Sequence, residues 1–174
     1  SIYSGGAMHL NNYNYHLTIQ STVFDSNSAT RVSGGAIYMY LSNSFIDISE
    51  CNFRNNTAWN RDTGSSNSVS SGGDSQGSLG GGALFAHTMN NELTIADTVF
   101  NNNVALVSSG GAIFLRSGHE NSIITNCSFV NNFSFRSGGG INLMTFNTGF
   151  QLINCYLTNN TAVSDGGGSL FVLA

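Results

Sequence analysis

Three carboxylates come closest to the spacing that a catalytic or metal-binding site would need. Asp47 and Glu50 lie three residues apart, and Asp97 follows Glu50 by 47 residues, an interval that recurs elsewhere in the chain. Paired carboxylates can act as general acid and base, and clustered carboxylates bind Ca²⁺. The chain has no lysine, however, and no arginine stands beside the pair. We therefore expect solvated turn residues here, with a weak cation site as the alternative, and no catalytic residue, resident metal or cofactor.

Histidines are the other groups that could bind a metal or transfer a proton. The chain contains four, at His9, His16, His87 and His119. Their intervals match neither the spacing of zinc ligands nor a nucleophile motif. We expect all four at polar positions on the surface.

The three cysteines share one position of the repeat described below with two threonines. The residues at this position are Thr22, Cys51, Thr98, Cys127 and Cys155. Cys127 and Cys155 would lie on neighbouring coils, near enough for a disulfide, but parallel side chains make that bond awkward. Small buried thiols are the simpler interpretation.

Asn-x-Ser/Thr sequons could accept N-linked glycans in a secreted eukaryotic protein. They occur at Asn55, Asn126, Asn132 and Asn159. Asn55 and Asn159 each precede a repeated asparagine and should face outward at a turn, so these two are the glycosylation candidates. Asn132 is itself a repeated asparagine and should be occluded.

Composition narrows the range of partners. Charged residues are 8% of the chain, the net charge is −4, and the five arginines form no cluster. Because nucleic acids and anionic membranes attract basic patches, neither is an expected partner. No run of about 18 apolar residues exists, so no helix is expected to span a bilayer. Hydrophobic residues still make up 40% of the chain, which favours a packed core over a disordered polar tract.

Two motifs repeat in phase along the chain. A Gly-Gly pair followed by a small and an apolar residue recurs at intervals of 29, 47, 29, 28 and 29 residues, beginning at Gly5, Gly34, Gly81, Gly110, Gly138 and Gly167. A Phe-x-x-Asn motif accompanies it at Phe24/Asn27, Phe53/Asn56, Phe100/Asn103 and Phe129/Asn132, and a Leu157/Asn160 pair follows. Self-similarity at a fixed period of this length is the signature of a repeat architecture.

The 47-residue interval contains 18 residues more than one repeat. The excess falls within residues 59–79, a Gly/Ser-rich stretch without apolar periodicity. Because the repeat resumes in register beyond it, we interpret 59–79 as an insertion in one coil that should protrude. Residues 1–174 are then a single segment cut from a longer protein.

The repeat reads as strands rather than helices. Apolar residues alternate at period two, as in Ile46-x-Ile48 and Leu93-x-Ile95, and Gly, Asn and Ser clusters break the runs. We predict an all-β fold, a right-handed single-stranded parallel β-helix of about five to six coils of 28–29 residues. Each coil should contain three strands around a triangular section, and neighbouring coils should stack at about 4.8 Å.

The paired GGA[I/L/V] and FxxN motifs resemble the repeats of polymorphic outer membrane proteins, which are chlamydial surface autotransporters, within the wider pectin-lyase-like β-helix class. The resemblance covers nearly the whole chain outside the insertion. It implies a β-helix exposed at the cell surface with an adhesive role. Membrane insertion by this segment is not expected.

Stacked coils turn repeated positions into columns. The aromatic column, Phe24, Phe53, Phe100 and Phe129, should point inward and form the core. The asparagine column, Asn27, Asn56, Asn103, Asn132 and Asn160, should sit at a turn, where side-chain amides can bond to neighbouring coils.

An outward aromatic stripe is the predicted interaction surface. If the apolar residue after each Gly-Gly-Ala points inward, alternation turns the next residue outward. The resulting interface candidates are Tyr38, Tyr40, Phe85, Phe114 and Phe171. A charge-poor aromatic patch usually marks a partner surface. The alternative is that a neighbouring segment or the insertion covers it.

These features favour an extracellular structural or adhesive module over an enzyme. Its partner would be another protein or a second copy of itself, as in a filament or a surface assembly. The competing hypothesis is a carbohydrate-binding or carbohydrate-active β-helix, similar to polysaccharide lyases or hydrolases. That function would require an acidic groove with basic and aromatic partners on one face.

Overall fold

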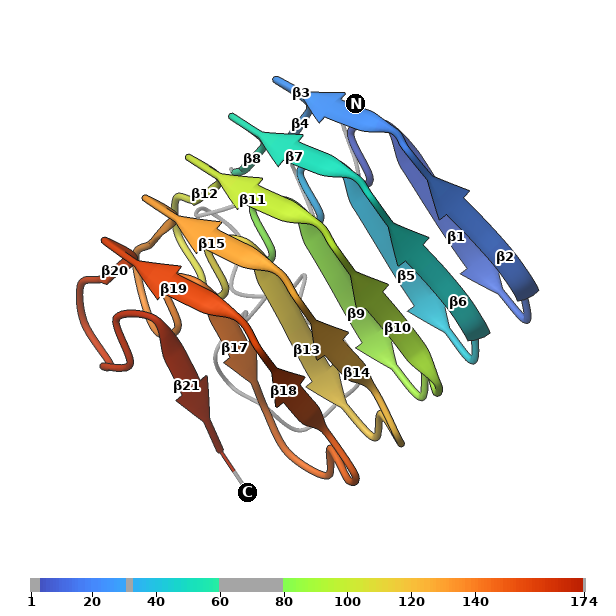
Figure 1. The fold of residues 1–174 in the computed structure, drawn as a ribbon. Coiled ribbons are helices and arrows are strands. Elements are labelled where there is room, and N and C mark those ends of the chain that lie inside the picture. Colours follow the sequence, from blue (N-terminus) through green and yellow to red (C-terminus); the bar gives the residue numbers. More distant parts are fainter. Residues whose placement is uncertain (1–3, 31–32, 60–79, 174) are drawn as a thin grey trace, which may run out of the picture.

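The computed structural model describes residues 4–30, 33–59 and 80–173. Within these ranges the chain forms strands and no helix, and the paired strands run parallel. The chain passes through four sheets in turn, so that successive coils stack on one another (Figure 1). The predicted all-β parallel β-helix is confirmed, as a solenoid of about five coils.

We name the four sheets A to D in the order in which each coil visits them. Sheet A contains β1 (Met8–Asn12), β5 (Ile37–Leu41), β9 (Leu84–Thr88), β13 (Ile113–Ser117), β17 (Ile141–Leu143) and β21 (Leu170–Val172). Sheet B contains β2 (Tyr15–Gln20), β6 (Ser44–Ser49), β10 (Leu93–Ala96), β14 (Ile123–Thr125) and β18 (Gln151–Ile153).

The other two sheets are built from shorter strands. Sheet C contains β3 (Val23–Asp25), β7 (Asn52–Arg54), β11 (Val99–Asn101), β15 (Ser128–Val130) and β19 (Tyr156–Thr158). Sheet D contains β4 (Ser28–Ala29), β8 (Thr57–Ala58), β12 (Val104–Ala105), β16 (Phe133–Ser134) and β20 (Thr161–Ala162). Each coil therefore has four strands, and the prediction of three was wrong. A strand of two residues is too short to show an alternating pattern in the sequence.

The strand register follows the repeat across the long interval. Ile37 in β5 pairs with Leu84 in β9, and Leu84 pairs in turn with Ile113 in β13. Of the Gly/Ser-rich stretch, only Trp59 is described; its backbone N–H donates to the Ala29 carbonyl. Residues 60–79 lie outside the described residues, so the protrusion of the insertion stays a prediction.

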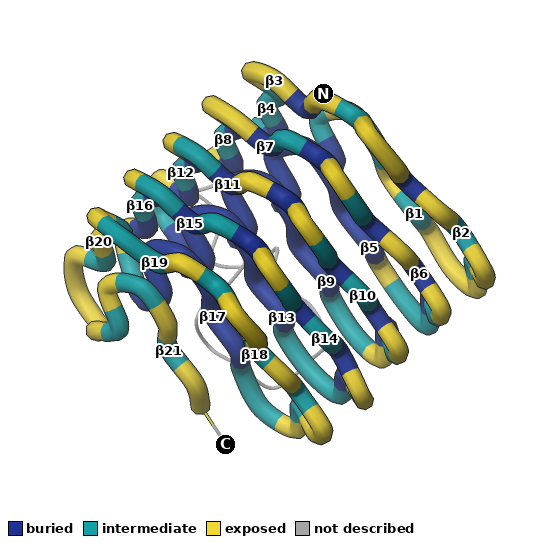
Figure 2. The backbone as a smooth tube through the Cα atoms, in the orientation of Figure 1, coloured by how far each residue is buried: buried dark blue, intermediate teal, exposed yellow. Residues whose placement is uncertain are grey.

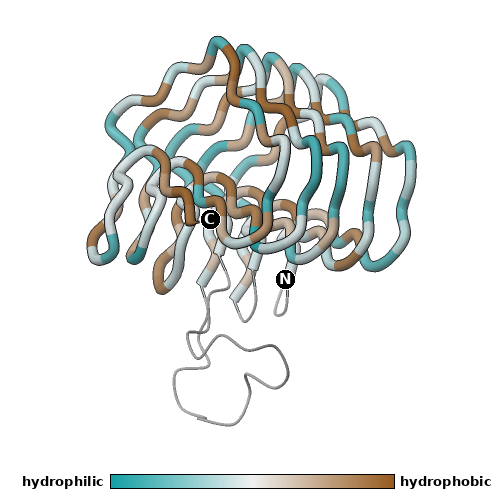
Figure 3. The backbone as a smooth tube through the Cα atoms, turned by 90° about the horizontal axis from the view of Figure 1, so that it is seen from below, coloured by the Kyte–Doolittle hydropathy of each residue, from teal (hydrophilic) through white to brown (hydrophobic). Residues whose placement is uncertain are grey.

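Aromatic rings stacked through the interior hold the coils together. The rings of Phe24, Phe53, Phe100 and Phe129 follow one another at centroid distances of 4.5, 4.9 and 4.8 Å and are nearly parallel. Three of the four are fully buried, and burying one such side chain stabilises a fold by roughly 1.5–3 kcal/mol. Figure 2 shows the buried positions following one another from coil to coil, and Figure 3 shows the hydrophobic positions recurring in the same way.

The repeated Gly-Gly pair marks the turn that leads into sheet A. Gly81 has φ +70°, and a Cβ atom there would lie 2.1 Å from the Leu84 carbonyl oxygen. A Cβ on Gly82 would lie 2.0 Å from the carbonyl oxygen of Gly111 in the next coil. The first glycine therefore allows the left-handed turn, and the second allows two coil backbones to approach closely.

Candidate interaction surface

The aromatic residues that follow the Gly-Gly turns do not form the predicted surface stripe. Phe85 and Phe114 are fully buried and Tyr38 is 5% exposed. Their rings stack on the outer side of sheet A at 5.5 and 5.1 Å, and Met144 packs against them. The assignment of Tyr38, Phe85 and Phe114 as interface residues was wrong, because they form a second hydrophobic cluster.

The segment before each Gly-Gly pair covers this cluster. A Cβ atom on Gly80 would lie 2.7 Å from Cδ1 of Phe114, so the backbone of the turn rests on that ring. Ser108 and Ser109, on the next coil, are 1% and 4% exposed. The left-handed turn at the glycine thus directs the preceding segment back over the outer face of sheet A. The alternation of the strand had predicted that this face would be exposed to solvent.

The same cover recurs on other coils. The Asn142 side-chain amide, which follows Phe114 in its column, donates to Ser137 Oγ at 3.0 Å. Tyr40, two residues along β5, is 39% exposed beside the His87 ring. Phe171, on β21, is half-buried. Among the interface candidates, only Tyr40 is exposed.

A different group of aromatic residues lies in solvent, at the turns between sheets A and B. We call these turns the A–B edge; they comprise residues 13–16, 42–45, 89–92, 118–121 and 146–149. The large exposed side chains there are Tyr13, Tyr15, Phe45, Met89 and Phe146, with exposed fractions of 62, 54, 44, 47 and 77%. The His16 ring stacks on the Phe45 ring at 4.9 Å. The edge therefore exposes large apolar side chains, beside polar residues such as Glu92 and Glu120.

Several of these exposed residues adopt a backbone conformation that bulky side chains avoid. Tyr13, Phe45, Met89 and Phe146 have φ of 57, 56, 49 and 61°. Ser42 and Gly118 occupy the same turn position as Tyr13, Met89 and Phe146, whereas Phe45 shares its position with Gly149. Left-handed backbone costs an ordinary residue roughly 1–2 kcal/mol, whereas glycine accepts it freely. The A–B edge thus carries large side chains where small ones would be more stable.

The corresponding turns between sheets C and D carry small polar residues in that conformation. We call them the C–D edge; their left-handed residues are Ser26, Asn55, Asn102, Asn131 and Asn159. Asparagine tolerates positive φ better than most residues. At the C–D edge every left-handed residue follows this preference, whereas at the A–B edge Ser42, Gly118 and Asn121 follow it and the four bulky residues do not.

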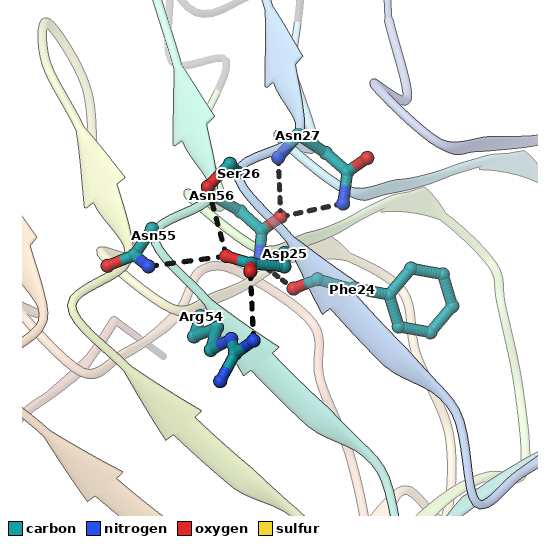
Figure 4. A network of polar contacts seen from close by, with 7 residues as sticks. All are labelled: Phe24, Asp25, Ser26, Asn27, Arg54, Asn55 and Asn56. Atoms are coloured by element: carbon teal, nitrogen blue, oxygen red, sulfur yellow. Dashed lines mark hydrogen bonds and ion pairs between the residues drawn. The ribbon is translucent and has the colours of Figure 1, made fainter.

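Beside each left-handed residue of the C–D edge lies the repeated asparagine, which forms a ladder. Asn56 Oδ1 accepts from the backbone N–H and the side-chain amide of Asn27 at 3.0 and 2.9 Å, and its own amide donates to the Phe24 carbonyl (Figure 4). The pattern repeats at Asn103, Asn132 and Asn160. Every buried amide in the ladder thus bonds to a neighbouring coil.

A second ladder, which the sequence interpretation missed, runs inside the A–B edge. It consists of Asn14, Asn43, Asn90, His119 and Asn147. His119 is 2% exposed, so its assignment to the surface was wrong; His9 and His16 are exposed and His87 is half-buried. The spacing of these residues repeats that of the first ladder and would have revealed the column.

The three candidate carboxylates lie at the surface. Asp47, Glu50 and Asp97 are exposed, and Glu50 and Asp97 occupy left-handed turn positions. Glu50 accepts from Ser21 Oγ at 2.8 Å, and Asp97 accepts from the Asn126 amide at 3.2 Å. Each therefore pairs with a neutral residue on a neighbouring coil. Within the described ranges, no three His, Cys, Asp or Glu residues could hold a metal ion together.

Another surface network joins two coils at the end of sheet C. Arg54 and Asp25 form an ion pair at 3.0 Å (Figure 4). Hydrogen bonds from Ser26 and Asn55, together with Arg54, hold the pKa of the Asp25 carboxyl below its usual value. The pair is exposed, so it contributes little to stability.

The cysteine and threonine column has a common bonding pattern. Thr98 Oγ1 donates to the Ala96 carbonyl at 2.8 Å, and Cys127 Sγ donates to the Thr125 carbonyl at 3.1 Å. Cys51 and Cys155 bond in the same way, and all three cysteines are free thiols. Burial raises the pKa of the Cys127 thiol to about 12, so it is not a nucleophile at neutral pH.

The sequons lie where their turn positions place them. Asn55 and Asn159 are exposed and Asn132 is fully buried in its ladder. Asn126 is exposed as well. Glycosylation at Asn55 and Asn159 stays a prediction.

Comparison with known proteins identifies the repeat. The sequence model of the Chlamydia polymorphic membrane protein repeat family matches residues 21–40 and 97–116. These two segments occupy equivalent positions in two coils. No curated protein and no solved structure matches the chain. No helix long and apolar enough to cross a membrane occurs among the described residues. Members of that family are chlamydial outer membrane proteins, so the match suggests a surface-associated domain. The chain is thus a parallel β-solenoid, two segments of which match the polymorphic membrane protein repeat.

Proposed function

We propose that the chain is an extracellular structural and adhesive module, and that its A–B edge associates with another protein surface, including that of a second copy. The repeat supports a location at the cell surface. The rigid stack of coils supports a structural role, because each coil holds the next through core rings and amide ladders. The proposed interface thus lies at the turns between sheets A and B, and not on the face of sheet A where the sequence had predicted it.

The observation that carries the proposal is the placement of Tyr13, Met89 and Phe146 in left-handed turns. Backbone strain of this kind persists where the surrounding structure enforces it, and it clusters at functional sites. Exposed aromatic side chains supply large contact area and are enriched in protein interfaces. Residues that cost stability and gain no burial within the solenoid are best explained by contacts with a partner.

The arrangement of polar groups favours this role over catalysis. Glu50 and Asp97 each bond to a neutral neighbour, and the buried thiol of Cys127 is held protonated. A carbohydrate-binding role remains the competing hypothesis, and the stacked rings of His16 and Phe45 favour it. Both roles use the A–B edge, so the same variants test both.

The test is a double variant, Tyr13→Gly with Phe146→Gly, assayed by adhesion of protein-coated beads to each other and to cultured cells. Glycine relieves the strain, so the variant should fold and be more stable than the unmodified protein, by about 1 kcal/mol per site. It should nevertheless lose adhesion. A variant that is more stable but no longer adheres would show that these side chains contribute to the interface and not to the fold.

The matched control is Asn102→Gly, which places glycine in an equally exposed left-handed turn at the C–D edge. It should leave adhesion unchanged. Equal adhesion by the double variant, or no adhesion by the unmodified protein, would exclude the A–B edge as the interface. Inhibition of adhesion by soluble glycans, but not by soluble protein, would support the carbohydrate hypothesis instead.

A further inference from the structure

A row of apolar side chains, separate from the A–B edge, lies directly after the strands of sheet D. We call it the sheet D ridge; it consists of Trp59, Leu106, Phe135 and Val163, which follow β8, β12, β16 and β20. Their exposed fractions are 43, 38, 49 and 56%. Backbone hydrogen bonds hold the row in register, since the Phe135 N–H, for example, donates to the Ala105 carbonyl of the preceding coil at 3.0 Å. Four consecutive coils thus expose an apolar residue at one position of the repeat.

Sheet D itself widens this apolar surface. Val104 of β12 pairs with Phe133 of β16, and both residues are half-buried. Thr57 and Thr161 occupy the same row on the coils to either side. The surface is therefore most apolar over two central coils and becomes polar at both ends of this row. An apolar centre with a polar rim is typical of protein interfaces, and exposed apolar patches mark sites of association.

The size of the ridge side chains favours a second copy that runs in the opposite direction. A two-fold axis between the coils of Leu106 and Phe135 would place each Leu106 against the partner's Phe135. The same axis would place Trp59, the largest ridge residue, against the partner's Val163, the smallest. In a pair that runs in the same direction, each residue would meet its own copy, so that two Trp59 rings would face each other. Large side chains therefore meet smaller ones only in the antiparallel pair.

The charges near the ridge favour the same arrangement. Neither the ridge nor the strands of sheet D carry a charged side chain among the described residues, so the two patches do not repel each other. Arg136 follows Phe135 directly, and Val107 follows Leu106. In the antiparallel pair each Arg136 lies opposite the partner's Val107, whereas in a pair of the same direction the two arginines would meet. Like charges in direct opposition weaken association.

We propose that the sheet D ridge pairs two copies of the chain in an antiparallel two-fold arrangement, with Leu106 of each copy packed against the partner's Phe135. The Gly/Ser-rich stretch that follows Trp59 is a poor alternative occupant, because residues 60–79 contain only two large apolar residues, Val69 and Leu79. This contact goes beyond the association proposed for the A–B edge and does not rest on it. The ridge precedes each strand of sheet A and the A–B edge follows it, so the pair leaves both A–B edges accessible. Paired ridges cover each other and do not join one coated bead to the next.

The experiment is sedimentation velocity over a series of protein concentrations. The unmodified protein should form a reversible dimer. Leu106→Glu places a carboxylate against the partner's Phe135 at both symmetric contacts and should weaken the dimer at least about 100-fold. The matched control is Val99→Glu on sheet C, because Val99 is 39% exposed and Leu106 is 38% exposed. The control should dimerise like the unmodified protein, and urea denaturation should show that both variants are folded.

A mixture of two variants tests the direction of the pair. Phe135→Arg alone should also prevent dimerisation. Mixed with Leu106→Glu, it should restore a dimer, because glutamate then meets arginine at one contact and the other contact is unmodified. In a pair that runs in the same direction, positions 106 and 135 would not meet, and the mixture would stay monomeric.

Three results would overturn the proposal: a monomeric unmodified protein at every soluble concentration, an equal loss of the dimer in Val99→Glu, or no dimer in the mixture. The double variant Tyr13→Gly with Phe146→Gly should remain dimeric, and a loss of its dimer would place the contact at the A–B edge instead. Leu106→Glu should still adhere to cultured cells. Dimerisation and adhesion are thus measured separately, so the ridge contact can fail while the proposed function stands, and the reverse.

Discussion

The outer face of sheet A and the A–B edge both carry aromatic side chains, but the side chains of the edge are far more exposed to solvent. Phe85 and Phe114 on the sheet are fully buried, whereas Tyr13 and Phe146 at the edge are 62% and 77% exposed. The two groups lie at successive positions of the repeat, although these four residues belong to different coils. What separates them is the buried segment before the Gly-Gly turns, where Gly80 rests on the Phe114 ring.

The difference shows that the alternation of a strand predicts which face a residue lies on, but not what covers that face. In a solenoid, both faces of a sheet can be buried when a turn folds back over it. Sheet A is such a case, because β5, β9 and β13 each begin with three successive buried residues. An aromatic residue is a candidate for binding only where no turn of the same chain reaches it.

The largest expected effect is on the buried group. Phe114→Ala should lower the free energy of unfolding by about 4 kcal/mol, because it removes a fully buried ring and leaves a cavity beneath the glycine turn. Phe146→Ala is the matched variant at the A–B edge and should change stability by less than about 0.5 kcal/mol. Urea denaturation of both variants measures the contrast. Equal losses would mean that the edge aromatics also contribute to the core.

The serine cover itself should contribute a smaller amount. Ser137→Ala removes the acceptor of the Asn142 amide, which is 1% exposed and would be left without this partner. An unsatisfied buried polar group costs roughly 1–3 kcal/mol, so we expect a loss of about 2 kcal/mol in the same assay. Ser164→Ala, whose exposed hydroxyl bonds to the Phe135 carbonyl, should be nearly neutral. A neutral Ser137→Ala would mean that packing, not bonding, holds the cover in place.

The fold could be predicted from the sequence because its two motifs constrain the backbone directly. Gly82 leaves no space for a side chain, and Asn56 satisfies three backbone or amide groups on neighbouring coils. Such requirements recur in every coil and therefore appear as repeats. The fourth strand of each coil could not be predicted, because a strand of two residues is too short to show an alternating pattern.

The candidate site was harder to predict, for two physical reasons. The burial of Phe114 depends on Gly80, on the preceding coil, whose path the pattern does not give. The role of His119 is apparent only when the coils are aligned, because the other four coils have asparagine at this position. The histidine taken alone gives no such indication. The αL turns of Tyr13 and Phe146 could not be inferred either, because their residue types suggest strands.

The smallest expected effect tests whether a bulky residue in a left-handed turn lowers stability equally at the two edges. Asn102 lies at the C–D edge with φ 55° and an exposed side chain, in the same conformation as Phe146 at the A–B edge. Asn102→Phe should therefore cost about 1 kcal/mol in urea denaturation, because the ring gains no burial and loses the tolerance of asparagine for positive φ. Asn102→Gly should cost nothing measurable. If phenylalanine at 102 proved harmless, bulky residues would be tolerated equally at both edges, and the aromatic residues of the A–B edge would no longer require a partner to explain them.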